Sequence, residues 1–122
     1  MFKSAIPVLR VSSSAAAEEF YSDRLGFNLQ FATPADRDRP DPCYMGFTRD
    51  DVMIHVSSFP GDGVTGGVVF LLVEDVDRLY TEFIAKGVPI ALTPTDQTWG
   101  NREMYVRDPD GNCLRFVHEI RR

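Results

Sequence analysis

Hydrophobic and polar positions along the chain predict the same order of elements twice. In the first round they predict a strand over residues 5–11, a helix over 15–26, and strands over 27–32, 43–48 and 52–57. Three serines follow the first strand and can cap the helix by accepting backbone N–H bonds, and Gly26 is a typical helix stop. The segment 33–42 holds three prolines and is predicted as a loop.

The second round predicts a strand over 68–73, a helix over 74–87, a strand over 88–92 and a closing hairpin over 102–119. Asp75 is the predicted cap of this helix and Gly87 its stop. The hairpin turns at DPDG (residues 108–111), where proline sets a negative φ and glycine permits a positive one. The glycine-rich residues 59–67 have no periodic pattern and are predicted as a linker.

The two rounds are βαβββ units in register with each other. Val11 and Val73, like Gly26 and Gly87, lie about sixty residues apart, and the turns that begin the last strand of each unit keep the same spacing. One unit alone would leave a short sheet with an exposed apolar face. We therefore predict an α+β fold in one domain, with two tandem βαβββ modules (about 4–58 and 68–119) whose curved mixed sheets surround a cleft. The modules pair either within a chain or between chains.

Composition limits the partners. A chain of 122 residues with 43% apolar residues can form one domain with a substantial core. A formal charge of -5 argues against non-specific binding to nucleic acid or anionic membranes, and the apolar run Val68–Val73 is too short to span a bilayer. We expect a cytoplasmic protein with Cys43 and Cys113 reduced; the alternative is a disulfide between them.

Three segments resemble one known family: FYSDRLGF (residues 20–27), VEDVDRLY (73–80) and WGNREMYVRDPDGNCLRF (99–116). They are similar to members of the vicinal oxygen chelate superfamily, which holds glyoxalase I, extradiol dioxygenases, fosfomycin-resistance enzymes and bleomycin-resistance proteins. The last segment looks most like the bleomycin-resistance branch. The resemblance implies a homodimer with ligand clefts at or near the subunit interface.

Metal-using members of this superfamily place His, Glu or Gln ligands at four strand positions that point into the cleft. The resemblance puts these positions on Ile6, His55, Val68 and Arg115. The two aliphatic side chains offer no lone pair, and the guanidinium of Arg115 has five N–H donors, no acceptor and a permanent charge. One imidazole does not make a site for a divalent cation. We predict no metal and no cofactor, and an organic ligand in the cleft.

The polar positions His55 and Arg115 have more than one interpretation. His55 is either a structural histidine bonded to a neighbour or a polar contact to a ligand. Arg115 lies between Leu114 and Phe116, so strand alternation points its guanidinium into the cleft, where it can bind an acceptor of the ligand. No nucleophile or second titrating partner is visible beside His55, so we predict no catalytic residue.

Aromatic residues complete the predicted ligand site. Trp99, the only tryptophan, lies in the predicted loop 93–101 and either closes the edge of the core or offers a flat face to a heteroaromatic or cationic group. The resemblance favours the second interpretation, because bleomycin-resistance proteins are implied to hold the bithiazole of the antibiotic against aromatic side chains. It places Phe31 near one of these aromatics. Phe70 faces the cleft by alternation with Val68, and Tyr105 is included although alternation does not fix its direction.

These observations predict a metal-independent protein that sequesters a bleomycin-type glycopeptide antibiotic without turnover, so that resistance follows by mass action. One alternative is a metal-dependent lyase, isomerase or dioxygenase of the same superfamily with a shifted metal site. A second is a binder of an unrelated metabolite. The loop Asp36–Asp41 is predicted as a solvated surface, and the net negative charge would help to attract a cationic ligand.

Overall fold

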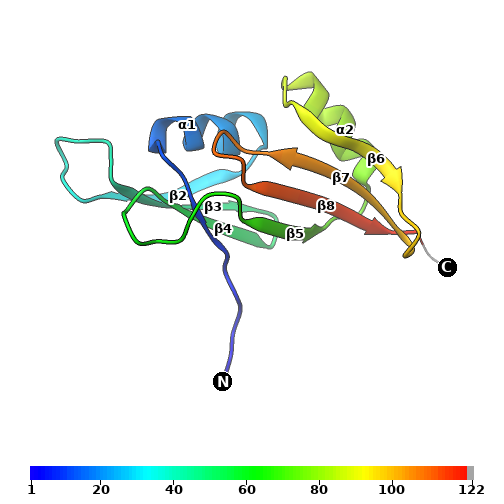
Figure 1. Ribbon diagram of the computed structural model, residues 1–122, viewed down its shortest axis with the longest axis horizontal. Helices are drawn as coiled ribbons and strands as arrows, with labels where there is room; N and C mark the ends of the chain where they lie inside the picture. Colours follow the sequence, from blue (N-terminus) through cyan, green and yellow to red (C-terminus); the bar gives the residue numbers. More distant parts are fainter. Residues whose placement is uncertain (121–122) are drawn as a thin grey trace.

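The computed structural model describes residues 1–120, which form two modules of the same architecture (Figure 1). In module 1 the elements are β1 (Val8–Arg10), α1 (Ser14–Glu18), the π-helical segment η1 (Glu19–Arg24), β2 (Asn28–Pro34), β3 (Cys43–Arg49) and β4 (Val52–Ser57). In module 2 they are β5 (Val68–Leu72), α2 (Val76–Ala85), β6 (Ile90–Asp96), β7 (Asn101–Arg107) and β8 (Cys113–Glu119). The predicted α+β fold of two tandem βαβββ units is confirmed.

Each module contains a four-stranded mixed sheet, and the two sheets repeat each other strand for strand. Their strand orders are β1-β4-β3-β2 and β5-β8-β7-β6; the first pair in each sheet is parallel and the other two are antiparallel. The registers repeat as well. Val8 lies opposite His55 in module 1, and Phe70 lies opposite Arg115 in module 2. The edge strands β2 and β6 also carry a shift of register.

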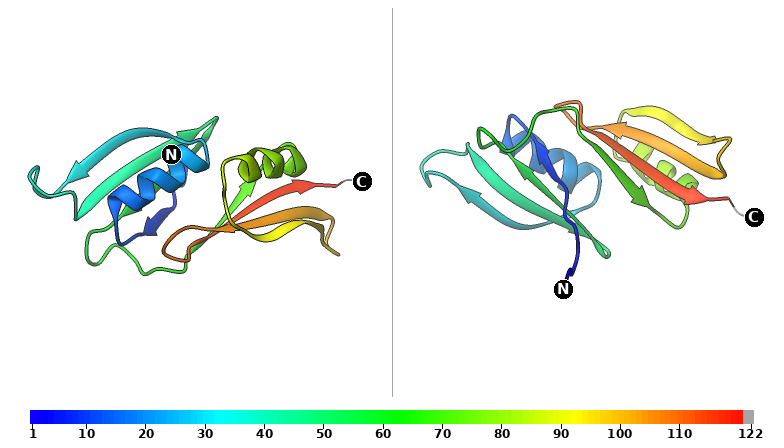
Figure 2. Two further views of the ribbon diagram at one scale, coloured as in Figure 1. Left: turned by 90° about the horizontal axis from the view of Figure 1, so that it is seen from above. Right: turned by 60° about the horizontal axis from the view of Figure 1, so that its bottom comes forward.

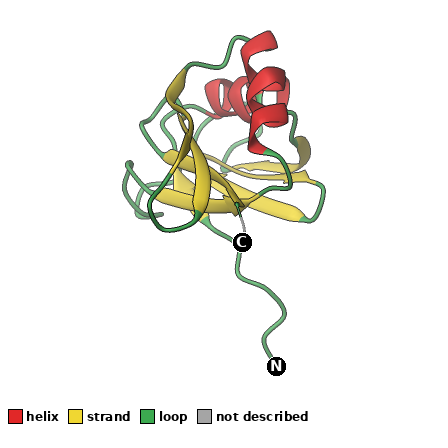
Figure 3. Ribbon diagram, turned by 90° about the vertical axis from the view of Figure 1, so that its right-hand side faces the viewer, coloured by secondary structure: helices red, strands yellow, loops and turns green. Residues whose placement is uncertain are grey.

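The helical segments lie on the same side of the sheets, and the core lies beneath them (Figures 2 and 3). Strand residues that point to this side are buried: Met45, Phe47, Ile54, Val56, Met104, Val106, Leu114 and Phe116. No helix or strand formed by residues 1–120 packs on the opposite side, which we call the open face of each module. The predicted cleft is therefore not enclosed by residues 1–120 of a single chain.

The helix ends follow the predicted capping residues. The side chains of Ser13 and Asp75 each accept a hydrogen bond from the backbone N–H three residues further on, at 3.2 and 3.1 Å. Gly26 and Gly87 follow the two helical segments with φ values of 78° and 73°, a left-handed conformation that favours glycine. Within residues 1–120, no helix is both long enough and apolar enough to cross a membrane.

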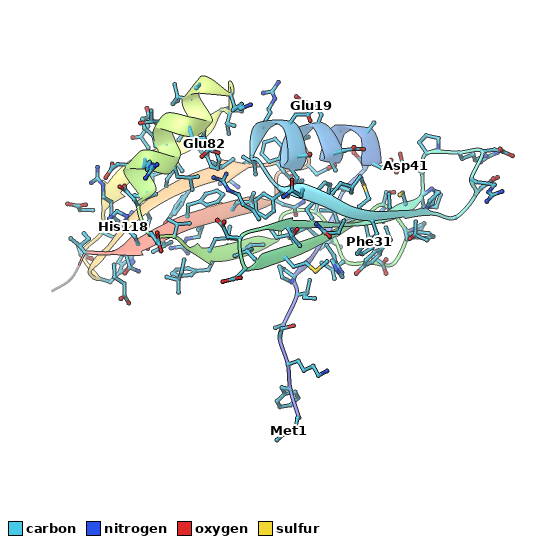
Figure 4. The ribbon with its side chains drawn as sticks, turned by 180° about the vertical axis from the view of Figure 1, so that it is seen from behind. Met1, Glu19, Phe31, Asp41, Glu82 and His118 are labelled. Carbon is cyan, nitrogen blue, oxygen red and sulfur yellow. The ribbon has the colours of Figure 1, made fainter. Side chains whose placement is uncertain are left out.

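Polar side chains join the two modules at two places. Asn112, between β7 and β8, donates to the carbonyl of Arg10 at 2.8 Å and accepts from two backbone N–H groups of the segment before β5. At the other place the Arg49 guanidinium donates two hydrogen bonds to the Glu82 carboxylate, at 2.7 and 2.8 Å. Glu82 is labelled on α2 in Figure 4, on the helix side of the sheets. These contacts fix the two modules side by side within one chain.

Three strand boundaries differ from the predictions. β1 spans three residues instead of seven, so Ile6 lies in an N-terminal arm that extends away from the sheets (Figure 1). The strands β2 and β6 are longer than predicted and take up part of the predicted loops, including Pro34 and Pro94. Both are edge strands, where the N–H that proline lacks is not needed by a neighbouring strand. The proline signal for a loop was therefore wrong at Pro34, and the loop predicted from the polar residues 93–101 begins only after Asp96.

Candidate ligand-binding site

Strand alternation builds the two open faces. Because Met45 and Ile54 point into the core, their neighbours along β3 and β4 point to the open face. The open face of module 1 therefore contains Val8, Phe31, Tyr44, Gly46 and His55. By the same alternation the open face of module 2 contains Val68, Phe70, Glu103, Tyr105 and Arg115. Both faces combine exposed apolar side chains with one polar pair.

The polar pair of module 1 is formed by Tyr44 and His55. The Tyr44 hydroxyl lies 2.8 Å from Nδ1 of His55, and their rings meet edge to face with centroids 5.2 Å apart. Burial, with a smaller effect of Asp62, raises the pKa of Tyr44, so its phenol stays protonated at neutral pH. Nε2 of His55 is buried and has no hydrogen-bond partner within residues 1–120.

Phe31 covers this pair from the edge strand β2. Its ring is nearly parallel to Tyr44, with centroids 6.2 Å apart, and meets His55 edge to face at 5.3 Å. A Cβ atom on Gly46, opposite Phe31 in the sheet, would lie 2.3 Å from the Phe31 ring. Only glycine at position 46 leaves room for this ring. Figure 4 labels Phe31 on the strand side, away from the helices.

The polar pair of module 2 is formed by Glu103 and Arg115. Glu103 is fully buried, and its Oε1 accepts hydrogen bonds from Nη2 of Arg115 and from the Tyr105 hydroxyl, both at 2.7 Å. Its Oε2 accepts from the Trp99 indole N–H at 2.8 Å and, more weakly, from the Asn101 side chain at 3.5 Å. One carboxylate thus connects the loop before β7, β7 itself and β8.

The electrostatics of module 2 favour a permanent ion pair. Burial alone would raise the pKa of Glu103, but hydrogen bonds from Arg115, Trp99 and Tyr105, together with the Arg115 charge, lower that pKa to about 2. The hydrogen bond to Glu103 raises the pKa of Arg115. The guanidinium carbon lies 4.9 Å from the centroid of the Tyr105 ring and 5.7 Å from that of Phe70, within the range of cation–π contacts. Module 2 therefore presents a charged pair between aromatic rings.

The six predicted ligand residues divide between the two faces. Phe31 and His55 lie together on module 1, whereas Phe70, Tyr105, Arg115 and Trp99 gather on module 2. The register fixes the direction of Tyr105, which alternation alone did not, because Tyr105 lies opposite Arg115. Trp99 is 59% exposed, and its indole edge is bound to Glu103.

One expectation about Arg115 needs revision. We expected its guanidinium to seek an acceptor on the ligand, but Glu103 supplies an acceptor within the chain. Sequence reasoning missed Glu103. Glu103 and Tyr105 point to the same side of β7 by alternation. A prediction that places Tyr105 on the open face therefore also places Glu103 there.

The four superfamily metal positions do not converge on a set of donors. Ile6 lies outside the strands, Val68 is aliphatic, and the guanidinium of Arg115 has no lone pair to give. His55 is the only potential ligand among the four. Within residues 1–120 no group of three or more His, Cys, Asp or Glu side chains is arranged to hold a metal ion. The two cysteines are buried and free.

A surface cavity of the single chain lies on the helix side of the sheets. It has a volume of about 740 Å³ and lies between the β3–β4 turn and α2, lined among others by Arg49, Leu79 and Glu82. Its walls include the ion pair that joins the modules. We favour the open faces as the ligand site, because the aromatic and polar side chains gather there.

Comparisons with known proteins identify relatives along the whole chain. A sequence model described as the Glyoxalase/Bleomycin resistance protein/Dioxygenase superfamily matches residues 5–116. Bleomycin resistance proteins of Geobacillus stearothermophilus and Staphylococcus aureus are 26% identical over 136 aligned positions, which cover 96% of this chain and 97% of the relative.

Two solved structures share the two-module architecture. A bleomycin-binding protein complexed with bleomycin is similar with a TM-score of 0.76 and 25% identity, over 97% of this chain and 99% of that one. A bleomycin resistance determinant encoded on the transposon Tn5 is similar with a TM-score of 0.77 and 25% identity, over 98% and 100% of the two chains.

Proposed function

Because the chain belongs to the Glyoxalase/Bleomycin resistance protein/Dioxygenase superfamily, we propose that its open faces bind a bleomycin-type glycopeptide antibiotic without catalysing a reaction. The observation that carries this proposal is the gathering of aromatic side chains around one polar pair on each open face. The similarity to bleomycin resistance proteins over almost the full chain supports the class of ligand.

Planar rings of the ligand would stack on the aromatic side chains. Phe31 and Tyr44 on module 1 are nearly parallel, and Phe70 and Tyr105 on module 2 flank a guanidinium. Stacking on such rings buries apolar area and is favourable for heteroaromatic groups. Trp99 projects beside the second set and adds an indole face. The net charge of -5 would increase the rate of association of a cationic ligand, and salt would weaken this effect.

We further propose that two chains form a homodimer in which an open face of one chain is opposed by an open face of its partner. Six apolar side chains of the sheets and the N-terminal arm are exposed on this side of the single chain: Ile6, Val8, Phe31, Val68, Phe70 and Leu72. Exposed apolar side chains gathered on one side of a chain are typical of an interface. Light scattering should give twice the chain mass, and a monomer at high concentration would contradict this part of the proposal.

A resident metal ion does not fit the residues at the superfamily positions. His55 is the only donor there, and its Nδ1 is already hydrogen-bonded to Tyr44. Arg115 would place a positive charge beside the cation. The proposed function is sequestration, in which the antibiotic is held away from its target while bound.

Calorimetric titration with bleomycin and thermal unfolding test the proposal together. If the dissociation constant is about 1 μM, ligand at about one hundred times that value stabilises the folded state by about 2.7 kcal/mol, which raises Tm by roughly 10 °C. Tyr105→Ala should reduce this rise, whereas Thr81→Ala on the exposed side of α2 should not. A folded wild-type protein with no heat of binding and no shift in Tm would contradict the proposal.

A further inference from the structure

Glu103 has more partners on the open face than any other side chain described above. It is fully buried, and its two oxygens accept four hydrogen bonds from side chains. Three of its partners, Trp99, Tyr105 and Arg115, are the residues through which module 2 would contact a ligand. Their positions depend on one carboxylate.

The carboxylate is closed to a ligand. Each oxygen already accepts two hydrogen bonds, which is the capacity of a carboxylate oxygen. The charge of Glu103 therefore acts on Arg115 and not on a bound molecule. Arg115 is part-buried, and its Nη2 forms an ion pair with Oε1 of Glu103 at 2.7 Å. The pair as a whole carries no net charge.

We propose that Glu103 is the positioning residue of the open face of module 2, and that by cancelling the charge of Arg115 it makes this face select uncharged planar rings over anionic ones. It holds Trp99, Tyr105 and Arg115 in one preformed surface, which lowers the entropy cost of binding. This inference rests on the proposed function for the location of the ligand surface, and it adds the selectivity of that surface and the residue that sets it.

Module 1 lacks such a device. The position equivalent to Glu103 is held by Tyr44, whose hydroxyl meets His55 as the Glu103 carboxylate meets Arg115. Tyr44 and His55 are joined by one hydrogen bond, whereas Glu103 and Arg115 form an ion pair. We therefore assign the discrimination between neutral and anionic rings to module 2.

A role of Glu103 in selectivity can be distinguished from a role in stability alone. If Glu103 only stabilises the sheet, then Glu103→Gln should lower Tm and leave the relative affinities of neutral and anionic rings unchanged. If Glu103 sets the selectivity, the same variant leaves Arg115 uncompensated and its face attracts anions. Glutamine keeps the size of the side chain and one acceptor oxygen, so the surface changes mainly in charge.

The experiment compares naphthalenesulfonate with naphthalenemethanol as anionic and neutral probes of one ring system, using Trp99 emission and calorimetry. In Glu103→Gln the affinity for naphthalenesulfonate should rise about tenfold, as expected for one uncompensated charge near a partly exposed site, with little change for naphthalenemethanol. The matched control Glu82→Gln breaks the ion pair with Arg49 on the helix side and should change neither affinity.

A second variant keeps the test decisive if Glu103→Gln does not fold. Arg115→Gln leaves Glu103 uncompensated, so it should weaken naphthalenesulfonate binding and favour naphthylmethylammonium. The double variant Glu103→Gln/Arg115→Gln should return the ratio of affinities to that of the wild-type protein. Unchanged ratios in the folded variants, equal changes in Glu82→Gln, or no binding of any probe would each overturn the inference.

The inference and the proposed function can fail separately. Absence of bleomycin binding, together with the expected change in probe selectivity, would contradict the proposed ligand and leave the role of Glu103 supported. Bleomycin binding with unchanged probe selectivity in Glu103→Gln would support the proposed ligand and contradict the proposed role of Glu103.

Discussion

The two modules share one backbone plan but fill its equivalent positions with different chemistry. On both open faces a polar side chain of the last strand meets a partner on the neighbouring strand: His55 meets Tyr44, and Arg115 meets Glu103. The first pair is bridged by a single hydrogen bond. The second is an ion pair whose carboxylate is completely buried. The strand register determines where His55 and Arg115 point. The partner on the neighbouring strand determines whether the pair is a hydrogen bond or an ion pair.

The aromatic ring near the polar pair also comes from a different strand in each module. In module 1 the ring over the polar pair comes from the edge strand, as Phe31, and its cross-strand neighbour is Gly46. In module 2 the edge strand provides the smaller Leu92, and its cross-strand neighbour Tyr105 provides the ring. Each module therefore has room for one ring at this place. The source of the ring is exchanged between two neighbouring strands.

The largest expected difference between the modules concerns their polar pairs. Arg115→Met should destabilise the protein by about 3 kcal/mol, because it leaves a buried carboxylate without its counter-charge. His55→Met at the equivalent position should cost only about 1 kcal/mol, the value of a neutral hydrogen bond. Urea unfolding at neutral pH measures both. Equal costs would show that the two pairs do not differ as described.

Acid should weaken the ion pair of module 2. The folded-state pKa of Glu103 is about 2, below its ordinary value of 4.5, so its contribution to stability is present above that ordinary value and is lost as the pH falls toward 2. Between pH 7 and about pH 3 this loss is about 2 kcal/mol.

Urea unfolding at both pH values isolates this effect. The difference in stability between the wild-type protein and Glu103→Gln should shrink by the amount of the loss, whereas the difference between the wild-type protein and Thr81→Ala should stay constant, because the Thr81 hydroxyl bonds only a backbone carbonyl. A Glu103→Gln difference that does not depend on pH would contradict the depressed pKa.

Substitutions at Gly46 and Phe31 test the steric difference between β2–β3 and β6–β7. Gly46→Ala should cost about 1 kcal/mol, because its Cβ atom displaces the Phe31 ring. Adding Phe31→Leu gives β2 the smaller side chain that β6 has at this place and should recover part of this loss in a thermal unfolding experiment. If the double variant is less stable than Gly46→Ala alone, the steric explanation is wrong.

Metal ions should have the smallest effect. The only donor among the superfamily positions is His55, so added Zn²⁺, Ni²⁺ or Mn²⁺ should change Tm by less than about 1 °C. Elemental analysis of the purified protein provides an independent check. A near-stoichiometric metal that is lost in His55→Gln would favour the alternative of a metal-dependent enzyme.

Local sequence signals were sufficient for the fold. The helix caps, the glycine stops and the DPDG turn each act within a few residues, and the repeat of about sixty residues ordered them into two modules. The proline signal for a loop failed at Pro34, because the cost of proline in a strand depends on whether that strand lies at an edge. Whether a strand lies at an edge depends on the arrangement of the whole sheet and cannot be determined from the neighbouring residues in the sequence.

The site was predicted only in part, for a related reason. Alternation placed Phe70 and Arg115 on the open face, but the partner of Arg115 depends on which residue of β7 lies diagonally across from it. Glu103 would ordinarily be interpreted as an exposed residue near a turn. Its burial arises from Trp99, Tyr105 and Arg115 together, and these come from three segments of the chain.

The most direct test of the proposed site is the nitrogen–proton NMR signal of the Trp99 indole, which is unique because the chain has one tryptophan. On titration with bleomycin this signal should shift and saturate, because its N–H lies on the open face of module 2 and is bonded to Glu103. A saturating shift confined to amides around Leu79 and Glu82, with the indole signal unmoved, would place the ligand in the helix-side cavity and contradict a ligand site on the open face.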